Sequence, residues 1–288
     1  MTDDVEQIAI IRAERAGAPL RRWMRACSPP YVHVVARFDQ TLLLEAQRGR
    51  PLLAVTTRAY AGPFRLVVAR LPQWREGASI AVTPTGLVGE GVKVAWPTEW
   101  WNPRPKPRML TPHARESAAA DLALAIARLD TPDDPFFERL EAEWSHVLAA
   151  IHRYPVHTAE ATLSPLVGYG NGLTPAGDDF LQAVLVTLAS GDEHDRARFR
   201  VVWRALAHHL RATTPLAAHF LREAGAGWGY EPLNALLDTL PTVPFARVEA
   251  LAAVGASSGV AALWGVLAAL SRETPASFDD QPPLWFRT

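Results

Sequence analysis

A proline-rich segment divides this chain into two parts with different sequence patterns. It runs from residue 97 to residue 112 and also contains Trp100 and Trp101. Proline fixes φ and lacks a backbone N–H, so neither a helix nor a central strand can continue through the segment. We therefore expect two domains, over residues 1–110 and 111–288. The prolines of the segment are Pro97, Pro103, Pro105, Pro107 and Pro112.

Short runs of β-favouring residues precede this boundary and are separated by glycine- and proline-containing turns. They predict a compact, largely antiparallel sheet or small barrel. Ahead of them, residues 3–16 place Val5, Ile8 and Ile11 on one side, which predicts a leading amphipathic helix that ends at Gly17. The β-favouring runs cover residues 31–35, 41–44, 52–57, 64–68, 80–82 and 92–96.

Helical patterns dominate the chain after the boundary. The fold class is therefore α+β, with a β-rich N-terminal domain followed by a predominantly helical C-terminal domain. The expected helices cover residues 114–129, 135–152, 180–189, 197–211, 216–224, 232–240, 247–254 and 260–270.

Composition indicates a folded protein, because 49% of the 288 residues are hydrophobic and 20% are charged. A net charge of −1 supplies no basic field, which disfavours a nucleic-acid partner. Cys27 is the only cysteine, which excludes an internal disulfide and fits a reducing compartment. The N-terminal sequence does not resemble a signal peptide, so we expect a cytoplasmic protein.

The uncharged stretch from residue 251 to residue 270 is long enough to span a bilayer. However, Gly-Ala-Ser-Ser-Gly interrupts it and alanine dominates it, so we expect a buried core helix and no membrane association.

Glycines, a hydroxyl, an amide and two adjacent carboxylates gather in Gly168-Tyr-Gly-Asn-Gly-Leu-Thr-Pro-Ala-Gly-Asp-Asp-Phe-Leu181. The first glycines permit a tight turn that can bring backbone amides close to a ligand. Thr174 is the expected N-cap of the following helix, with Pro175 as its first residue. The apolar run over residues 180–189 predicts a helix enclosed by other elements.

Two interpretations account for Asp178 and Asp179. They can simply complement the positive end of the helix. Alternatively, they face a ligand, as a general base or as ligands of Mg²⁺ together with a substrate phosphate. The glycines and Asn171 immediately before them favour the second interpretation.

Two further helix starts could bind the same anion, because helix N-termini offer free N–H groups and partial positive charge. The first is Gly255-Ala-Ser-Ser-Gly259, where either serine can cap, although its small residues also suit tight helix packing. The second is Arg211-Ala-Thr-Thr-Pro215, where either threonine can cap and Arg211 can contact a phosphate or carboxylate. Thr-Pro also occurs at Thr111 and Thr131, as an ordinary helix opener.

Several familiar sites are absent from the sequence. No His-Glu-x-x-His motif supports a histidine-bound zinc, and no histidine motif near Cys27 supports a cysteine hydrolase. The glycine-rich segment is neither a P-loop nor a Rossmann fingerprint, so nucleotide binding is not indicated.

Three motifs make the chain resemble the AllH-type family, a subunit of oxamate carbamoyltransferase in anaerobic allantoin breakdown. The strongest match is residues 172–181, where the family usually has serine in place of Ala176. Residues 213–221 and 255–259 also match. The resemblance implies a role in moving a carbamoyl group between an oxamate-like acceptor and phosphate, together with partner subunits.

Carbamoyl transfer passes through a tetrahedral oxyanion, which backbone N–H groups at the helix starts can stabilise. Asn171 would orient the carbamoyl amide, and Asp178 or Asp179 would act as general base. The candidate residues for binding oxamate, carbamoyl phosphate or phosphate are Gly170, Gly172, Thr174, Gly177, Arg211, Thr213, Thr214, Ser257, Ser258 and Gly259.

Two alternatives stay open from the sequence. One is a non-catalytic subunit that binds a small carboxylate or takes part in assembly. The other, with less support, is a magnesium-dependent hydrolase of small amides or phosphates.

Overall fold

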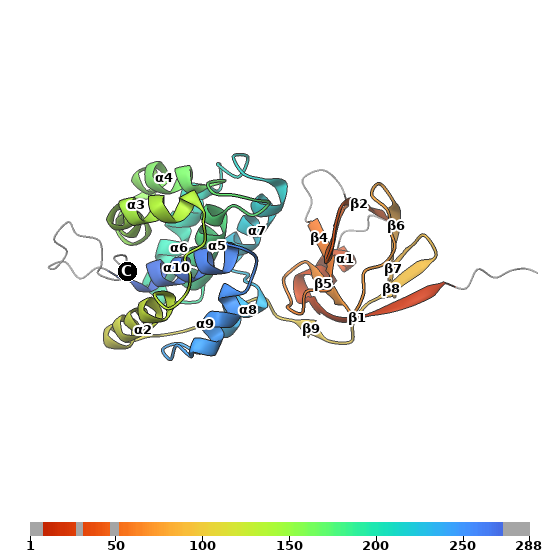
Figure 1. Cartoon of the computed structure of the whole chain (residues 1–288), viewed down its shortest axis with the longest axis horizontal. Helices are drawn as coiled ribbons and strands as arrows, with labels where there is room; N and C mark the ends of the chain where they lie inside the picture. Colours follow the sequence, from red (N-terminus) through yellow and green to blue (C-terminus); the bar gives the residue numbers. More distant parts are fainter. Residues whose placement is uncertain (1–7, 27–30, 47–51, 273–288) are drawn as a thin grey trace, which may run out of the picture. The chain divides into compact units, whose positions relative to one another are not determined.

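The computed structural model describes residues 8–26, 31–46 and 52–272. It divides into two compact units, Met1–Pro103 and Arg104–Thr288, and the division falls inside the proline-rich segment. The described part of the N-terminal unit consists mainly of strands, whereas the C-terminal unit is helical (Figure 1). The α+β prediction, with a β-rich half followed by a helical half, is confirmed.

The N-terminal strands form a sheet that closes on itself. They are β1 (Ala9–Gly17), β2 (Tyr31–Phe38), β3 (Thr41–Glu45), β4 (Leu52–Thr56), β5 (Arg65–Val68), β6 (Ser79–Thr83), β7 (Gly86–Gly89), β8 (Val92–Ala95) and β9 (Trp100–Trp101). Their order is β5-β4-β3-β2-β6-β7-β8-β1-β9, and β1 also pairs with β5, which closes β1 to β8 into a barrel. Most neighbours are antiparallel; β1 runs parallel to β8 and β9, and β4 parallel to β5. The predicted antiparallel sheet or small barrel is confirmed.

Side chains alternate between the barrel interior and its surface, as the two-residue period of a strand requires. In β2, Val32 and Val34 are buried, whereas Tyr31 and Val35 are exposed. The interior also holds the fully buried Trp74, whose indole N–H donates to the carbonyl of Gly89 at 2.7 Å.

The predicted leading helix over residues 3–16 is wrong over its described part. Residues 9–17 form β1, which pairs with β8 on one side and with β5 on the other. Its apolar residues also fit a two-residue period, with Ile11 and Ala13 buried and Ile10 exposed. Barrel closure therefore decides the conformation of a segment whose pattern is ambiguous. A helix does follow, α1 (Ala18–Ala26), while residues 3–7 lie outside the described part.

The C-terminal unit is a bundle of helices. They are α2 (Pro112–Ile126), α3 (Pro135–His152), α4 (Val156–Leu163), the 3₁₀ helix η1 (Ser164–Leu166), α5 (Ala176–Ala189), α6 (Glu193–Leu206), α7 (Pro215–Gly225), α8 (Glu231–Leu237), α9 (Phe245–Ala252) and α10 (Ser258–Leu270). Each helix expected from the sequence overlaps one of these, whereas α4 was not expected. No described helix is both long and apolar enough to cross a membrane.

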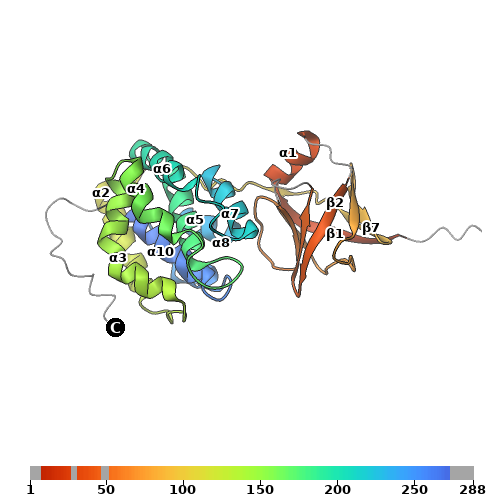
Figure 2. The same cartoon turned by 90° about the horizontal axis from the view of Figure 1, so that it is seen from above.

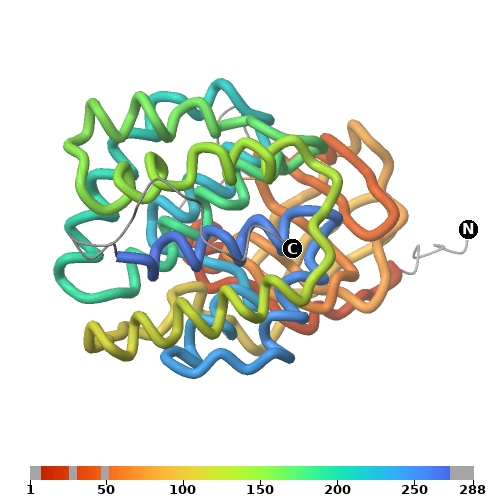
Figure 3. Tube along the Cα trace, turned by 60° about the vertical axis from the view of Figure 1, so that its left-hand side comes forward, coloured from red at the N-terminus to blue at the C-terminus, as the bar shows by residue number. Residues whose placement is uncertain are grey.

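Helices α5 and α10 pack against each other at the centre of this unit (Figure 2). Residues 176–188 of α5 are all buried, which confirms the prediction of an enclosed helix. In α10, residues 259–270 are buried as well, and the helix runs through the middle of the bundle in Figure 3. A Cβ on Gly265 would collide with the carbonyl of Phe180, so glycine permits this close approach. The packing places the two helix starts side by side.

Candidate functional site

The starts of α5, α7 and α10 meet at the glycine loop, which we define as residues 168–175. The hydroxyl oxygen of Thr174 lies 3.1 Å from that of Ser258, the first residue of α10. The hydroxyl of Thr213, just before α7, donates to Oδ2 of Asp178 in α5 at 2.6 Å. Three motifs that are far apart in the sequence therefore form one cluster.

Positive φ angles shape the glycine loop, as its composition predicts. Gly168 has φ +75° and Gly170 has φ +117°. A Cβ on Gly168 would collide with the carbonyl of Ala212, and one on Gly170 would lie 2.7 Å from the backbone nitrogen of Ala176. Gly172 also has a positive φ, +86°, but faces open space. The first two glycines are thus needed for close packing, and the third for the turn itself.

Asp178 is buried and fully engaged by the loop and by α7. The backbone N–H of Gly168 lies 3.1 Å from its Oδ1 and 3.2 Å from its Oδ2, and Thr213 donates to Oδ2. Burial raises the pKa of Asp178 from 3.8 to about 6, and the hydrogen bonds from Thr213 and Gly168 oppose this rise. Asp178 therefore ties the loop to α5 and to the start of α7.

Asp179 is buried with fewer partners. Its Oδ2 atom has no hydrogen-bond partner among the described residues. Burial raises the pKa of Asp179 from 3.8 to about 8; the hydroxyls of Ser258 and Thr174 lower it, and the charges of Asp178 and Asp134 raise it further. This shift favours the neutral, protonated form of the carboxyl group.

Asp134 belongs to the cluster and was not predicted from the sequence. It is 6% exposed and caps α3, because Oδ1 accepts from the backbone N–H of Phe136 at 3.0 Å. Its Oδ2 accepts from the N–H of Asn171, also at 3.0 Å. An aspartate directly before Pro135 is a recognisable helix start. Nothing in the local pattern, however, indicates its contact with the glycine loop.

The helix starts differ from the sequence predictions in two of three cases. Thr174 does not cap α5: Pro175 takes the N-cap position, and the N–H of Gly177 donates instead to the carbonyl of Tyr169 at 2.8 Å. Ser257 is the N-cap residue of α10 but makes no side-chain capping bond. Of the two threonines that could cap α7, Thr214 does so, and Pro215 is the first helical residue as predicted.

Gly177 and Gly259 occupy tightly packed positions. A Cβ on Gly177 would collide with the carbonyl of Leu166, and one on Gly259 with the carbonyl of Leu251. The N–H of Gly259 donates to the carbonyl of Val254 at 2.8 Å. Both N–H groups are therefore already used, so in this conformation the hydroxyl groups are the better placed contacts for a ligand.

Asn171, Gly172 and Arg211 are exposed at the edge of the cluster. Arg211 precedes Ala212, whose carbonyl packs against Gly168, so Arg211 belongs to the segment next to the glycine loop. The positions of these residues allow contact with a ligand from solvent.

The donor set does not assign a metal ion to the cluster. Among the described residues, no three histidine, cysteine, aspartate or glutamate side chains gather in a way that could hold one. Asp178 is directed to Gly168 and Thr213, whereas Asp179 is directed to Thr174 and Ser258. We therefore do not identify either aspartate as a metal ligand.

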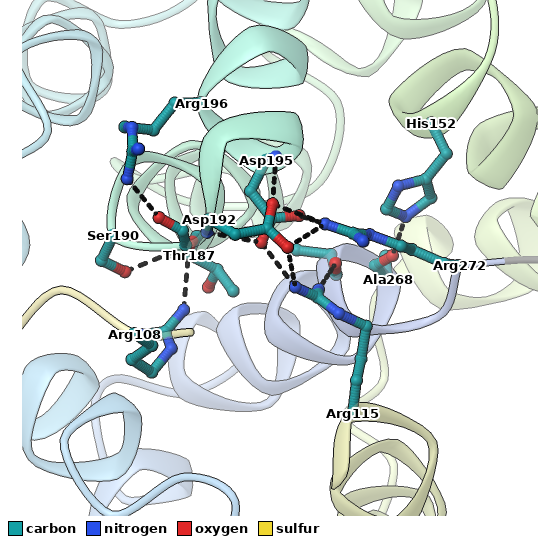
Figure 4. Close-up of polar contacts among 12 residues, drawn as sticks. Arg108, Arg115, His152, Thr187, Ser190, Asp192, Asp195, Arg196, Ala268 and Arg272 are labelled. Carbon is teal, nitrogen blue, oxygen red and sulfur yellow. Dashed lines mark hydrogen bonds and ion pairs between the residues drawn. The ribbon is translucent and has the colours of Figure 1, made fainter. Parts of the chain in front are cut away.

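A second polar cluster lies at the opposite ends of α5 and α10 (Figure 4). Asp195 forms a buried ion pair with Arg115 at 2.5 Å and a partly buried one with Arg272 at 2.7 Å, and Arg272 also contacts Asp192 at 2.8 Å. Arg108 donates to the carbonyl of Thr187 at 2.9 Å. The sequence did not indicate this cluster, because its members are scattered among ordinary helix residues.

This cluster stabilises helix C-termini, whose last carbonyls lack partners within the helix. Arg115 donates to the carbonyl of Ala269 at 3.4 Å. His152 places Nε2 2.8 Å from the carbonyl of Ala268 and must donate to it. Burial lowers the pKa of His152 to about 4, so its ring is neutral. We interpret the cluster as structural.

Residues 166–270 match the model of the family described as oxamate carbamoyltransferase subunit AllH. The match contains the glycine loop and the starts of α5, α7 and α10, and it confirms the resemblance over these residues. Comparisons with curated proteins and with solved structures found no match.

Proposed function

We propose that the C-terminal unit is the substrate-binding part of a carbamoyltransferase subunit, and that its ligand is a small anion such as oxamate, carbamoyl phosphate or phosphate. One observation carries this proposal. The three motifs that support the family resemblance meet at the glycine loop, where Thr174, Ser258 and Thr213 gather around two aspartates. A merely structural role for each helix start would not require them to converge.

The anion would lie on the outer side of the hydroxyl pair Thr174 and Ser258, which are both half-buried. Hydroxyl groups donate to carboxylate and phosphate oxygens, and the nearby starts of α5 and α10 add partial positive charge. Arg211 would supply the opposite charge, and Asn171 would bind the carbamoyl amide. Three of the predicted binding residues, Gly170, Gly177 and Gly259, would not contact the ligand. They would act indirectly, because glycine permits the backbone path that brings the helix starts together.

Asp178 supports this site as a positioning residue. Its carboxyl group holds Gly168 and Thr213, so it keeps the loop and the start of α7 in place. Asp179 is the better candidate for acid–base work, because its Oδ2 has no partner among the described residues and two hydroxyls face the group.

The subunit would act with partner chains, as the family description implies, and a cytoplasmic location follows from the sequence expectations. The alternative is a non-catalytic subunit that senses or holds a small carboxylate for another chain. The two differ in a simple way: only the first predicts turnover by the assembled complex that depends on Asp179.

Isothermal titration calorimetry of the purified chain with oxamate, carbamoyl phosphate and phosphate tests the binding site. We expect binding that is weakened at least tenfold in Ser258→Ala and in Arg211→Gln. Arg247→Gln, which changes an exposed arginine on α9 that is not among the candidate binding residues, is the matched control and should bind as wild type does. Addition of Mg²⁺ decides whether a metal contributes to affinity.

Two outcomes would contradict the proposal. If none of the anions binds the intact chain, alone or with candidate partner subunits, the assigned ligand class is wrong. If binding occurs but is unchanged in Ser258→Ala and Arg211→Gln, the anion lies elsewhere.

A further inference from the structure

Two neighbouring aspartates in the first turns of α5 have unequal surroundings. Asp178 accepts hydrogen bonds from Gly168 and Thr213, which leaves both of its oxygens occupied. Asp179 is 7% exposed, and its Oδ2 has no partner among the described residues. Burying an ionised carboxylate without hydrogen-bond donors costs free energy, whereas a neutral carboxylic acid needs fewer donors. The geometry therefore separates the two groups into a charged and a neutral member.

The hydroxyl pair connects Asp179 with the outside. Thr174 Oγ1 and Ser258 Oγ lie 3.1 Å apart, and either atom can be the donor. A hydroxyl group donates and accepts at the same time, so two adjacent hydroxyls can pass a proton along. Both residues are half-buried, while Asp179 is buried. The pair thus bridges the buried acid and the surface at which the anion would bind.

Burial, and then the charges around Asp179, favour its neutral form. Asp178 on the same helix and Asp134 at the start of α3 both raise its pKa, while the loop and α10 contribute only the uncharged hydroxyls of Thr174 and Ser258. The positive end of α5 acts in the opposite direction. That effect is about 0.3–1 kcal/mol, less than one pKa unit at about 1.4 kcal/mol, so it cannot cancel a rise from 3.8 to about 8.

We propose that Asp179 holds a proton beside the hydroxyls of Thr174 and Ser258 and exchanges it through them with an anion bound at the glycine loop. This inference rests on the proposed function for its ligand. It explains how an anion can approach a cluster with three aspartates, since the proton removes one negative charge. It also assigns the acid–base role to Asp179 and the positioning role to Asp178.

The proton exchange supplies both proton transfers that the proposed carbamoyl transfer requires. An oxygen of hydrogen phosphate attacks the carbamoyl carbon of an N-carbamoyl donor, and the bond from that carbon to the donor nitrogen breaks. The departing nitrogen needs a proton, and the phosphate must lose one. Asp179 gives its proton through the hydroxyl pair to the nitrogen and recovers one from phosphate, so no further reactant is required.

Infrared difference spectroscopy of the full chain tests the proton without any ligand. A carboxylic-acid carbonyl band should be present at about pH 7 and disappear as the pH rises through about 8. It should be missing in Asp179→Asn and retained in Asp178→Asn, the matched control. In Ser258→Ala the band should persist to higher pH, because the hydroxyl of Ser258 lowers the pKa of Asp179.

Calorimetry with oxamate tests the exchange, because the carboxylate of oxamate stays ionised between about pH 6 and pH 9. Above about pH 8, wild type should take up a proton on binding, measured from the dependence of the heat on the buffer. Its affinity should fall about tenfold per pH unit there, whereas that of Asp179→Asn should not.

The outcomes separate this inference from the proposed function. Absence of a band that depends on Asp179 overturns the inference, even if anions bind. A band without anion binding at any pH places the proton on Asp179 but refutes both the exchange and the proposed function. If Asp179→Asn does not fold, the shift in Ser258→Ala decides: a band that titrates as in wild type contradicts the inference.

Discussion

Thr213 and Asp178 join the start of α7 to the first turn of α5 through a hydrogen bond of 2.6 Å between Oγ1 and Oδ2. The two residues are 35 positions apart in the sequence, and the bond is partly buried. It holds together the two sides of the candidate site, so its removal has consequences that can be measured.

Thr213→Val removes this hydrogen bond and preserves the shape of the side chain. We expect the free energy of unfolding to fall by about 1.5–3 kcal/mol, because hydrogen bonds to ionised groups contribute about that much. The pKa of Asp178 should rise further above 6, because the hydroxyl opposes the effect of burial. Urea denaturation and a carboxyl titration by NMR measure the two effects.

Thr162→Val is the control for this substitution, because Thr162 donates to the carbonyl of Thr158 in its own helix, at 3.3 Å, and therefore joins no two elements. Its effect should stay below about 0.5 kcal/mol. Equal losses in the two variants would show that the bond between Thr213 and Asp178 contributes nothing specific.

Asp179→Asn should change how stability depends on pH. The pKa of Asp179 is raised to about 8, so its proton stabilises the folded state fully below 3.8, and this contribution is lost as the pH rises through about 8. Asparagine does not titrate, so the variant has no such contribution to lose as the pH rises. Relative to wild type, the variant should therefore gain stability steadily between about pH 4 and pH 8, by up to about 1.4 kcal/mol per pH unit.

For Asp178→Asn, the difference in stability from wild type should stop changing above about pH 6, because the pKa of Asp178 is raised only to about 6. Urea denaturation at several pH values measures both differences. A difference for Asp179→Asn that is flat across the range would refute the assignment of a proton to Asp179.

Gly265→Ala should disturb the contact between α5 and α10. Alanine normally favours a helix over glycine, so its propensity alone predicts a gain of about 1 kcal/mol. The new Cβ would instead collide with the carbonyl of Phe180, and overpacking costs about 1–3 kcal/mol. We expect a lower melting temperature. Gly62→Ala, where the Cβ finds ordinary contacts of 3.4 Å or more, should be tolerated.

Asp195→Ala should strongly destabilise the C-terminal unit. It removes the buried partner of Arg115 and Arg272, and loss of one member of such a network costs about 3–5 kcal/mol. Glu143→Ala breaks the partly exposed pair with Arg139 and should cost about 0.3–0.5 kcal/mol. Chemical denaturation compares the two; similar small effects would mean that the buried pairs do not hold the helix ends together.

Much of the fold could be predicted from local pattern. The proline-rich segment indicated where the chain changes character, and the helices after it are long enough for their period to be read. The barrel strands were recognisable from short β-favouring runs between turns. Residues 9–17 were not recognisable as a strand, because their apolar positions suit a helix and a strand equally. Only pairing with β5 and β8 selects the strand.

The candidate site shows the same division. The sequence by itself determined the tight loop at Gly168 and Gly170 and the start of α7 at Pro215 with a threonine cap, because backbone angles and capping are local properties. The tertiary structure decided which groups meet: it brought Thr174 to Ser258, added Asp134, and gave donors to Asp178 while leaving Asp179 with few. Burial and partners set a carboxyl pKa, and both depend on contacts between distant segments, so two adjacent aspartates that look equivalent in sequence acquire different chemistry in the fold.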